Sequence, residues 1–190
     1  TANSSSEYAP LAGSELKVDV AIVGGGFTGL SAAVHLGQRG VRAVVLEAQS
    51  PGWGASGRNG GQVLPGLKED PDTIERMLGE ERGKRMVRLA GGAPDEVFDL
   101  IAQLGIACDP VRTGWIQPAH SAKTLAASAE RARQWQLRGA PVETLSQEAV
   151  TRLIGTTAYM GGAIDRRAGS VHPLNFCLGL AEAATRLGAR

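Results

Sequence analysis

The chain has 190 residues, of which 43% are hydrophobic, and a formal net charge of +1. That length suffices for one sizeable core or two small lobes, while the scattered charges exclude the concentrated basic surface used to bind nucleic acid or anionic membranes. No apolar stretch approaches the roughly 20 residues needed to span a bilayer. The 26 glycines are about twice the usual share of ~7%, which favours an α/β protein that cradles a ligand.

The first predicted element is a strand over Lys17 to Val23, whose apolar run suits burial on both faces of a parallel sheet. Three glycines follow at the spacing of a dinucleotide-binding turn. Gly24 would form the tight turn, Gly26 would let a pyrophosphate approach the backbone, and Gly29 would let the next helix pack on the strand. That helix, from about Thr28 to Arg39, would offer free N–H groups and its positive dipole end to the phosphates.

A second predicted strand, Val41 to Leu46, ends at Glu47, about 20 residues after the glycines. A carboxylate there can accept both hydroxyls of an adenosine ribose and would repel the 2′-phosphate of NADP. A lone glycine triplet also occurs in ordinary turns. Here strand, glycines, helix, strand and acid occur in order, which favours the nucleotide site.

The loop from Gly52 to Gln62 is rich in glycine, serine and asparagine. Such a loop builds little core but can wrap a ligand with backbone amides and short polar side chains. It leaves the second strand at the carboxyl edge, where open α/β sheets bind ligands. The alternative is a flexible surface linker, but linkers rarely carry residues such as Trp53 and Arg58 among their glycines.

The middle of the chain is predicted to be mainly helical. Pro71 to Leu78 forms a short helix, and Glu80 to Leu104 holds a longer one that Gly91, Gly92 and Pro94 could split or kink. The apolar stripe of the longer helix comprises Met86, Leu89, Val97, Leu100, Ile101 and Leu104.

The remaining predicted elements alternate between strands and capped helices. A strand and turn fall within Gly105 to Gln117, and a strand covers Ala158 to Ile164. Ser121 and Ser146 are suited to cap helices. These helices would run to about Arg138 and from Gln147 to Leu153, and a last helix would cover Pro173 to Leu187 before Gly188.

Histidines and cysteines show no metal-ligand spacing, so no metal is expected. His35 is predicted to be a surface residue, and His172, before Pro173, is predicted to fix a helix entry. Cys108 and Cys177 read as free buried thiols in a reducing compartment, which favours the cytoplasm. Trp115 is expected in the core of the second sheet, with a place lining a pocket left open.

Several segments together resemble a known family. They are residues 19–30, residues 44–48, residues 54–62, residues 161–175 and the lead-in at 8–10. They are similar to the FAD-dependent amine and amino-acid oxidoreductases of the D-amino-acid oxidase superfamily, and within it to the gamma-glutamylputrescine oxidase subgroup. The first motif is shared by many flavoproteins, whereas the Gly-Arg-Asn-Gly-Gly loop is more specific.

The resemblance implies a set of FAD-binding residues. Those at the pyrophosphate would be Gly24, Gly26, Phe27, Thr28 and Gly29. Glu47 and Ala48 would hold the adenosine ribose. Those running toward the flavin ring would be Ser56, Gly57, Arg58, Asn59, Gly60, Gly61 and Gln62. Some relatives attach the flavin to a histidine of this loop; because residues 50–66 contain none, we expect non-covalent FAD, while attachment through a cysteine beyond this chain stays open.

The implied activity is oxidation of the C–N bond of an amine to an imine by hydride transfer to flavin. The substrate would be gamma-glutamylputrescine or a related polyamine-derived or amino-acid compound, and the electron acceptor oxygen or a quinone. The catalytic residues are unassigned, being expected mostly beyond Arg190, so this chain alone would be inactive. The alternatives are a non-catalytic dinucleotide-binding subunit completed by a partner chain, and an NAD or FAD enzyme of other chemistry sharing only the glycine motif.

The predicted fold class is therefore α/β, a Rossmann-like FAD-binding βαβ unit with the start of a mixed α+β substrate domain. Residues 1–16 are a lead-in, 17–66 the FAD-binding unit and flavin loop, and 67–170 the helices and strands of the substrate domain. Residues 171–190 form a helix returning to the FAD-binding unit, and a right-handed crossover places a third strand directly after Arg190. Because that strand is missing and no initiator Met is present, the chain is expected to be a truncated N-terminal portion.

Overall fold

The computed structural model describes residue 8, residue 10 and residues 15–190, so most of the predicted lead-in lies outside the described residues. The chain divides into two compact units. Unit 1 contains the described residues up to Gly61 together with Asp99–Pro110 and Val171–Arg190, and unit 2 contains Gln62–Phe98 and Val111–Ser170. Residues 62–66 thus belong with unit 2 and residues 99–110 with unit 1, a different division from the one predicted.

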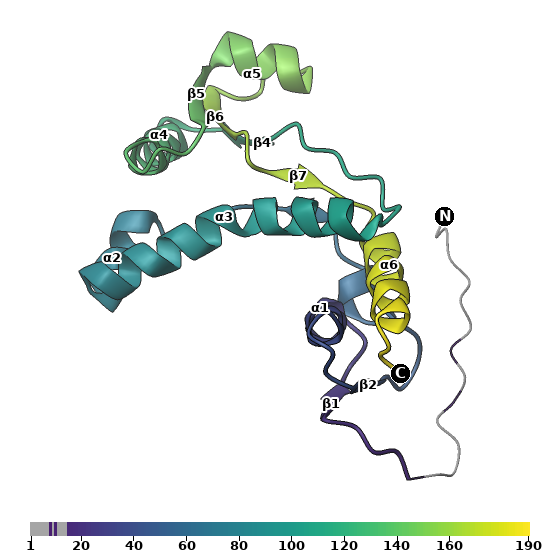
Figure 1. Ribbon diagram of the computed structural model, residues 1–190. Helices are drawn as coiled ribbons and strands as arrows, with labels where there is room; N and C mark the ends of the chain where they lie inside the picture. Colours follow the sequence, from purple (N-terminus) through teal and green to yellow (C-terminus); the bar gives the residue numbers. More distant parts are fainter. Residues whose placement is uncertain (1–7, 9, 11–14) are drawn as a thin grey trace. The chain divides into compact units, whose positions relative to one another are not determined.

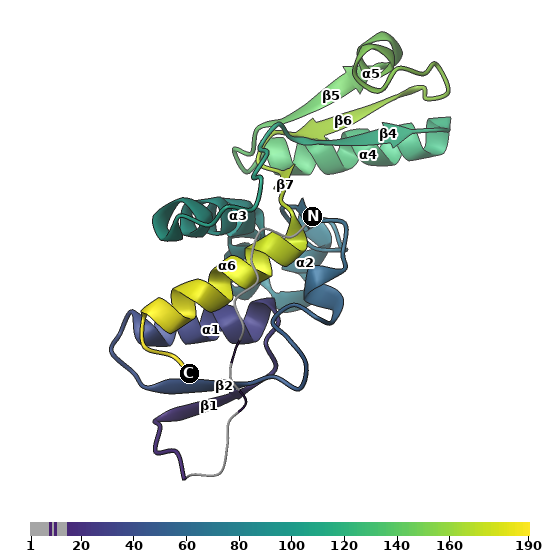
Figure 2. The same cartoon turned by 90° about the vertical axis from the view of Figure 1, so that its right-hand side faces the viewer.

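Unit 1 is built on two parallel strands, β1 (Val20–Val23) and β2 (Ala43–Leu46), joined by the helix α1 (Phe27–Gly37). A second helix, α6 (Pro173–Arg186), packs beside α1. Figures 1 and 2 both show the two helices on one face of the strands. The core between them consists of aliphatic side chains that include Leu30, Val34 and Leu180. The predicted βαβ path is confirmed. Both strands begin two or three residues later than expected, and the helix begins one residue earlier and ends two residues earlier.

The prediction that β1 is buried on both faces is wrong for the described residues. Its burial alternates, and the side chain of Val23 is 87% exposed. Successive residues of a strand point to opposite faces, and the helices of unit 1 cover only one of them. The apolar run of β1 therefore has one uncovered face in this structure.

The helix α6 begins at Pro173 as predicted and ends at Arg186, one residue before the predicted end. His172 is its N-cap, and the Nδ1 atom of this residue accepts a hydrogen bond of 3.2 Å from the backbone N–H of Asn175. After α6 the backbone N–H of Arg190 donates to the carbonyl of Ala43, and the N–H of Val45 donates to the carbonyl of Arg190. Arg190 is therefore hydrogen-bonded to the two residues on either side of Val44, which is the pattern of a parallel β-ladder. Arg190 thus lies beside β2 where the third strand was predicted to begin.

Unit 2 holds a three-stranded antiparallel sheet with β6 (Gly161–Asp165) between β4 (Trp115–Ala119) and β5 (Val142–Ser146). A separate short pair joins β3 (Gln62–Val63) to β7 (Gly169–Ser170). The strands β3, β5 and β7 were not predicted, because β5 is mixed in polarity and the other two are only two residues long.

Two helices of unit 2, α4 (Ala122–Gln136) and α5 (Gln147–Ile154), pack against this sheet, and a third, α2 (Pro71–Leu78), packs against α4. The predicted caps are confirmed: the hydroxyl of Ser121 accepts from the N–H of Thr124, and that of Ser146 accepts from the N–H of Ala149.

The helix α3 (Glu80–Leu104) is uninterrupted through Gly91, Gly92 and Pro94, and its residues 80–98 belong to unit 2. Its predicted stripe is wrong near the N-terminus, where Leu89 is 71% exposed and Val87 and Ala90 are buried. The buried face of α3 is set by contacts with residues far away in the sequence, which the hydropathy of the helix cannot reveal. At Gly91, for example, a β-carbon would lie 3.0 Å from both Trp135 and Arg167.

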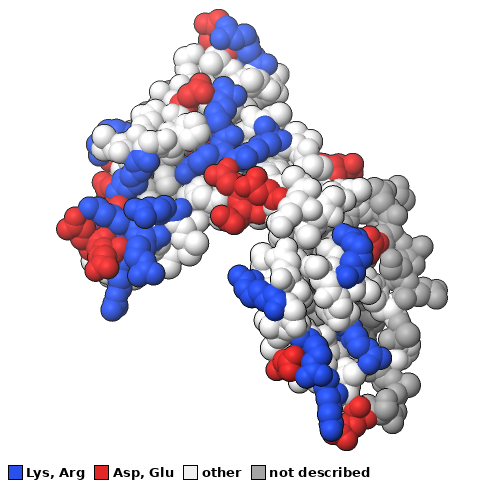
Figure 3. All heavy atoms as spheres, viewed as in Figure 1, with Lys and Arg blue, Asp and Glu red and all other residues white. Residues whose placement is uncertain are grey.

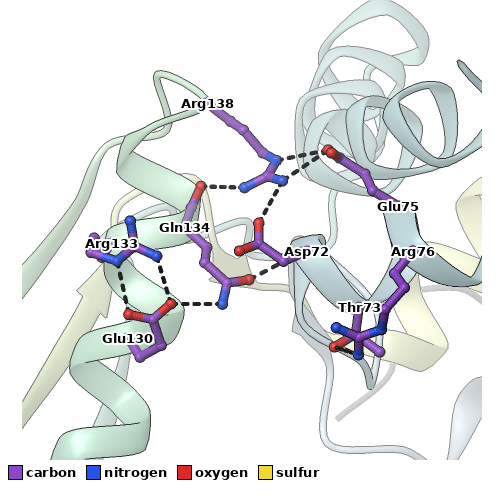
Figure 4. A network of polar contacts seen from close by, with 8 residues as sticks. All are labelled: Asp72, Thr73, Glu75, Arg76, Glu130, Arg133, Gln134 and Arg138. Atoms are coloured by element: carbon purple, nitrogen blue, oxygen red, sulfur yellow. Dashed lines mark hydrogen bonds and ion pairs between the residues drawn. The ribbon is translucent and has the colours of Figure 1, made fainter. Parts of the chain in front are cut away.

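Polar contacts fix α2 to α4 within unit 2 (Figure 4). The guanidinium of Arg138 donates to the carboxylates of Asp72 and Glu75, and the buried side chain of Gln134 accepts from the N–H of Asp72 while donating to Glu130. These bonds satisfy groups at the start of α2 that would otherwise lack partners.

Basic and acidic side chains are interspersed over the face drawn in Figure 3. Several are partners in ion pairs, including Arg166 with Glu143 and Arg112 with Asp95. Among the residues that the structure describes, no helix is long and apolar enough to cross a membrane, and no group of three or more metal-binding side chains could hold a metal ion.

Candidate functional site

The glycine turn joins β1 to the start of α1. Gly24 has a φ of +102°, a conformation that favours glycine, so its predicted role in a tight turn is confirmed. A β-carbon at Gly29 would lie 2.1 Å from the carbonyl oxygen of Gly24 and 3.1 Å from Ile22, which confirms that this glycine lets helix and strand meet. At Gly26 a β-carbon would lie 2.8 Å from the hydroxyl oxygen of Ser56, so the space above the turn is narrow.

Glu47 lies at the end of β2, with its carboxylate fixed by backbone amides. Its Oε2 atom accepts a hydrogen bond of 2.7 Å from the N–H of Gly25, and its Oε1 atom accepts one of 2.9 Å from the N–H of Gln49. These bonds, that from Gly25 foremost, hold the pKa of Glu47 below its usual range. The charged carboxylate is therefore anchored beside the turn, and each oxygen keeps a lone pair for a ligand hydroxyl.

The loop after β2 is folded onto the glycine turn. The N–H of Gly52 donates to the carbonyl of Gly25 at 2.9 Å, and the hydroxyl of Ser56 accepts from the N–H of Phe27 at 3.1 Å. The second bond joins the loop to the first turn of α1, whose N-cap Gly26 has no side chain. Residues 29 positions apart in the sequence are thus brought together at the start of the helix.

The middle of the loop is held by its own side chains. Asn59 donates to the carbonyls of Ala55 and Ser56 and accepts from the N–H of Gly61. The guanidinium of Arg58 lies 4.9 Å from the ring centre of Trp53, and its Nε atom donates to the carbonyl of Trp53 at 2.6 Å. The short 3-10 turn of residues 55–57 thereby keeps a defined shape and leaves Arg58 exposed.

The helix α6 supports the loop and turn from within unit 1. The thiol of Cys177 lies 3.8 Å from the carbonyl oxygen of Gly25, and the rings of Phe27 and Phe176 are 5.3 Å apart. Burial, and to a lesser extent the charge of Glu47, raises the pKa of Cys177 to about 11. This cysteine is therefore a neutral packing residue under the site, as its predicted free and buried state implies.

Most of the predicted cofactor residues converge in unit 1. They are Gly24, Gly26, Phe27, Thr28, Gly29, Glu47, Ala48, Ser56, Gly57, Arg58, Asn59, Gly60 and Gly61. Gln62 instead begins β3 in unit 2, where it pairs with Ser170.

Sequence reasoning missed three supporting residues. Gly25 supplies the amide that holds Glu47, Gly52 ties the loop to the turn, and Cys177 packs beneath both. The adjacent glycine runs were the only signal for the first two.

The geometry fits a dinucleotide. Within the described part of the chain, the N–H groups of Thr28 and Gly29 at the start of α1 donate to no carbonyl or side chain. Free amides at a helix N-terminus favour a phosphate, the lack of a side chain at Gly26 lets the hydroxyl of Ser56 approach the turn, and the fixed carboxylate of Glu47 suits a ribose. These features define a dinucleotide-binding protein of the Rossmann class.

Comparison with known proteins defines the family. A model of the DAO family, the FAD dependent oxidoreductases, matches residues 19–190, so the chain belongs to this family of enzymes whose cofactor is FAD. The chain is 36% identical over 192 residues to Gamma-glutamylputrescine oxidoreductase of Escherichia coli, which covers 100% of this chain and 45% of that protein. It is 31% identical to Probable oxidoreductase OrdL of Haemophilus influenzae, covering 99% of this chain and 44% of that protein.

Solved structures share the fold. Glycine oxidase from Geobacillus kaustophilus matches with a TM-score of 0.78 at 24% identity, covering 91% of this chain and 45% of that one. L-Amino acid deaminase from Proteus myxofaciens matches with a TM-score of 0.76 at 19% identity, covering 100% of this chain and 41% of that one. The chain thus spans less than half the length of the relatives that it matches.

Proposed function

We propose that this chain is the FAD-holding N-terminal portion of an oxidoreductase that oxidises the C–N bond of an amine to an imine, which water then hydrolyses. Our preferred substrate is gamma-glutamylputrescine, with related polyamine-derived amines and amino acids as the wider class. The observation that carries the proposal is the similarity over the whole chain to Gamma-glutamylputrescine oxidoreductase. The fixed geometry of turn, loop and Glu47 supports it.

The residues of unit 1 would hold the cofactor in distinct ways. The amides at the start of α1 would bind the pyrophosphate. The missing side chain at Gly26 would keep the turn close to both the cofactor and the hydroxyl of Ser56, since a β-carbon there would lie 2.8 Å from that hydroxyl oxygen. Glu47 would accept the ribose hydroxyls, because its carboxylate stays charged and its position is set by two amides. Arg58, at the rim of the loop, would add a positive charge beside the phosphates.

FAD bound in this way would accept a hydride from the carbon next to the amine nitrogen. The described residues would hold it, and two contacts support this role: Ser56 ties the flavin loop to α1, and Asn59 fixes the shape of that loop. Because the relatives are more than twice as long, we place the catalytic residues, the substrate contacts and the contacts to oxygen or a quinone in the remainder of the polypeptide. The free buried cysteines support a cytoplasmic location.

The first experiment tests the cofactor. The full-length protein is purified, and its bound cofactor is extracted and identified. We expect FAD, released by denaturation because the flavin loop offers no histidine for covalent attachment. Gly26→Val would displace the hydroxyl of Ser56 and fill the turn, so it should lose FAD, whereas Gly54→Val should retain it because Gly54 has open space around its backbone. This pair of results would support the placement of the cofactor at this turn. Unchanged FAD binding by Gly26→Val would refute that placement.

The second experiment tests the reaction. The flavin-loaded, full-length protein is mixed anaerobically with a panel of amines, and the flavin absorbance is followed. We expect bleaching by gamma-glutamylputrescine and slower bleaching by putrescine, which lacks the glutamyl group. Bleaching by an amino acid alone would move the substrate to the amino-acid class, and bleaching by no amine would refute the proposed reaction while leaving the cofactor assignment intact.

A further inference from the structure

Unit 2 contains a cavity that the proposed function does not use. It has a volume of about 240 Å³ and lies between α4, the strands β4 and β6, and residues 64–68. Figure 2 shows α4 lying along these strands. This volume is far more than the ~10–15 Å³ that one structural water needs.

The lining combines aromatic and polar side chains. Trp115 and Trp135 contribute apolar surface, and Gln117, Ser128, Arg131 and Lys68 contribute polar groups. Trp115 and Gln117 alternate along β4 and therefore point to the same face of the sheet as the paired Asp165 and Ala163. Trp115 was expected in the core of the second sheet, with a place lining a pocket left open, and it lines this cavity.

The hydroxyl of Ser128 is buried and has no hydrogen-bond partner among the described residues. Most buried polar atoms are hydrogen-bonded, so an orphaned hydroxyl beside a cavity needs an explanation. Within the same described part of the chain, the side chains of Gln117 and Lys68 take part in none of the hydrogen bonds or ion pairs formed. Three polar groups around one cavity thus have unused hydrogen-bonding capacity.

The unused capacity consists mainly of donors. Arg131 uses its Nε atom on Asp70 and its Nη2 atom on the carbonyl of Lys68, which leaves its Nη1 atom for another acceptor. Asp165, the acid in the lining, is already occupied, because both its oxygens accept from Arg167. The cavity therefore offers N–H and O–H donors and the unpaired positive charge of Lys68.

We propose that this cavity binds a small organic monocarboxylate. Its carboxylate would accept from Ser128, Gln117 and Arg131, and its apolar body would pack on Trp115 and Trp135. The single unpaired cation favours one negative charge. This site lies wholly in unit 2, whereas the described cofactor residues other than Gln62 lie in unit 1, so the proposal does not depend on the proposed function.

Isothermal titration calorimetry of the flavin-loaded, full-length protein tests this proposal. The probes are butanoate and 3-phenylpropanoate, each compared with its uncharged amide. We expect the carboxylates to bind at least about tenfold more tightly than the amides, since a charge-assisted hydrogen bond is stronger than a neutral one. The flavin absorbance should stay unchanged, which separates this site from binding beside the flavin.

Two variants locate the binding. Ser128→Ala should weaken carboxylate binding about fivefold through the lost hydrogen bond without lowering the melting temperature of the free protein, because that hydroxyl has no protein partner. Ser128→Leu should abolish binding by filling the cavity. The matched control is Ala126→Leu, on the exposed side of α4.

Three results would overturn the proposal. They are no binding of either carboxylate, equal binding of carboxylates and amides, and binding that Ser128→Ala and Ser128→Leu leave unchanged. The first result would mean that the cavity holds water only. The second would mean that binding does not depend on the negative charge, and the third that the probes bind elsewhere.

Discussion

The substitution Gly29→Ala tests the packing of the glycine turn most directly. The added β-carbon would lie 2.1 Å from the carbonyl oxygen of Gly24, where ordinary contact is at least 3.4 Å. The obstacle is backbone, which cannot rotate away as a side chain can. The start of α1 must therefore move by more than an ångström relative to β1, and this would displace the amides proposed to bind the pyrophosphate.

The cost follows from two opposing terms. Overpacking of this kind costs about 1–3 kcal/mol, and alanine recovers up to ~1 kcal/mol over glycine within a helix. We therefore expect a net destabilisation of about 1–2 kcal/mol. Because the amides at the start of α1 are displaced, we also expect FAD affinity to fall about tenfold, which corresponds to ~1.4 kcal/mol of binding free energy. The matched control is Gly54→Ala, where a β-carbon would meet nothing within 4 Å.

The assay combines urea unfolding of the full-length protein with FAD titration of the apoprotein. Gly29→Ala should lose stability and FAD affinity, whereas Gly54→Ala should retain both. If the two variants bind FAD equally well, the close approach of helix and strand does not govern the cofactor site, and our reasoning about this turn is wrong.

Three further predictions concern the remaining charges and thiols. Hydrogen bonds from Arg133 and Gln134 lower the pKa of Glu130 from 4.5 to about 2. The stabilising effect of the charged Glu130 is therefore complete above about pH 4.5 and is lost as the pH falls toward 2. Glu130→Gln should make the free energy of unfolding less dependent on pH over this range, and an unchanged pH profile would contradict the assignment. Arg167→Met leaves the carboxylate of Asp165 buried without its partner at 2.6 Å. This variant should lower the free energy of unfolding in urea by about 3 kcal/mol, and adding Asp165→Asn should restore part of the loss. A loss under ~1 kcal/mol would show that the pair is solvated. Burial raises the pKa of both Cys108 and Cys177 to about 11. Neither thiol should therefore be modified by Ellman's reagent at pH 8 until the protein unfolds. Rapid labelling of either cysteine in the native protein, located by mass spectrometry, would refute this.

The sequence predicted the elements whose signals are local. Ser121 and Ser146 cap α4 and α5 because a hydroxyl oxygen directly before a helix can accept from an N–H group of the first turn that lacks a partner within the helix. The bounds of α2 and α3 also match, since Pro71 opens the first and Gly105 follows the second. The buried face of α3 could not be predicted in this way, because Gly91 faces inward only through its contact with Trp135, which is far away in the sequence.

In the candidate site, too, the features with a local sequence signal could be predicted and those that depend on distant contacts could not. The spacing of Gly24, Gly26 and Gly29 and the position of Glu47 are local patterns, and the structure brings these residues together. The bond from Phe27 to Ser56 depends on how the loop folds back, which no periodicity encodes. Loop residues could therefore be predicted as a group through the family resemblance, whereas their individual contacts required the structure.

The uncovered face of β1 yields a last prediction. Val23 is 87% exposed here, although it is the last residue of the apolar strand β1. Arg190 pairs with the edge of β2 that faces away from β1. Since the relatives are more than twice as long, we propose that the remaining polypeptide covers this face. Val23→Ala should then cost about 2 kcal/mol in the full-length protein, as for a buried valine. Leu89→Ala, at a residue 71% exposed on α3, should stay within ~0.5 kcal/mol. Equal and small effects at both positions would mean that the face of β1 is open to solvent in the whole protein.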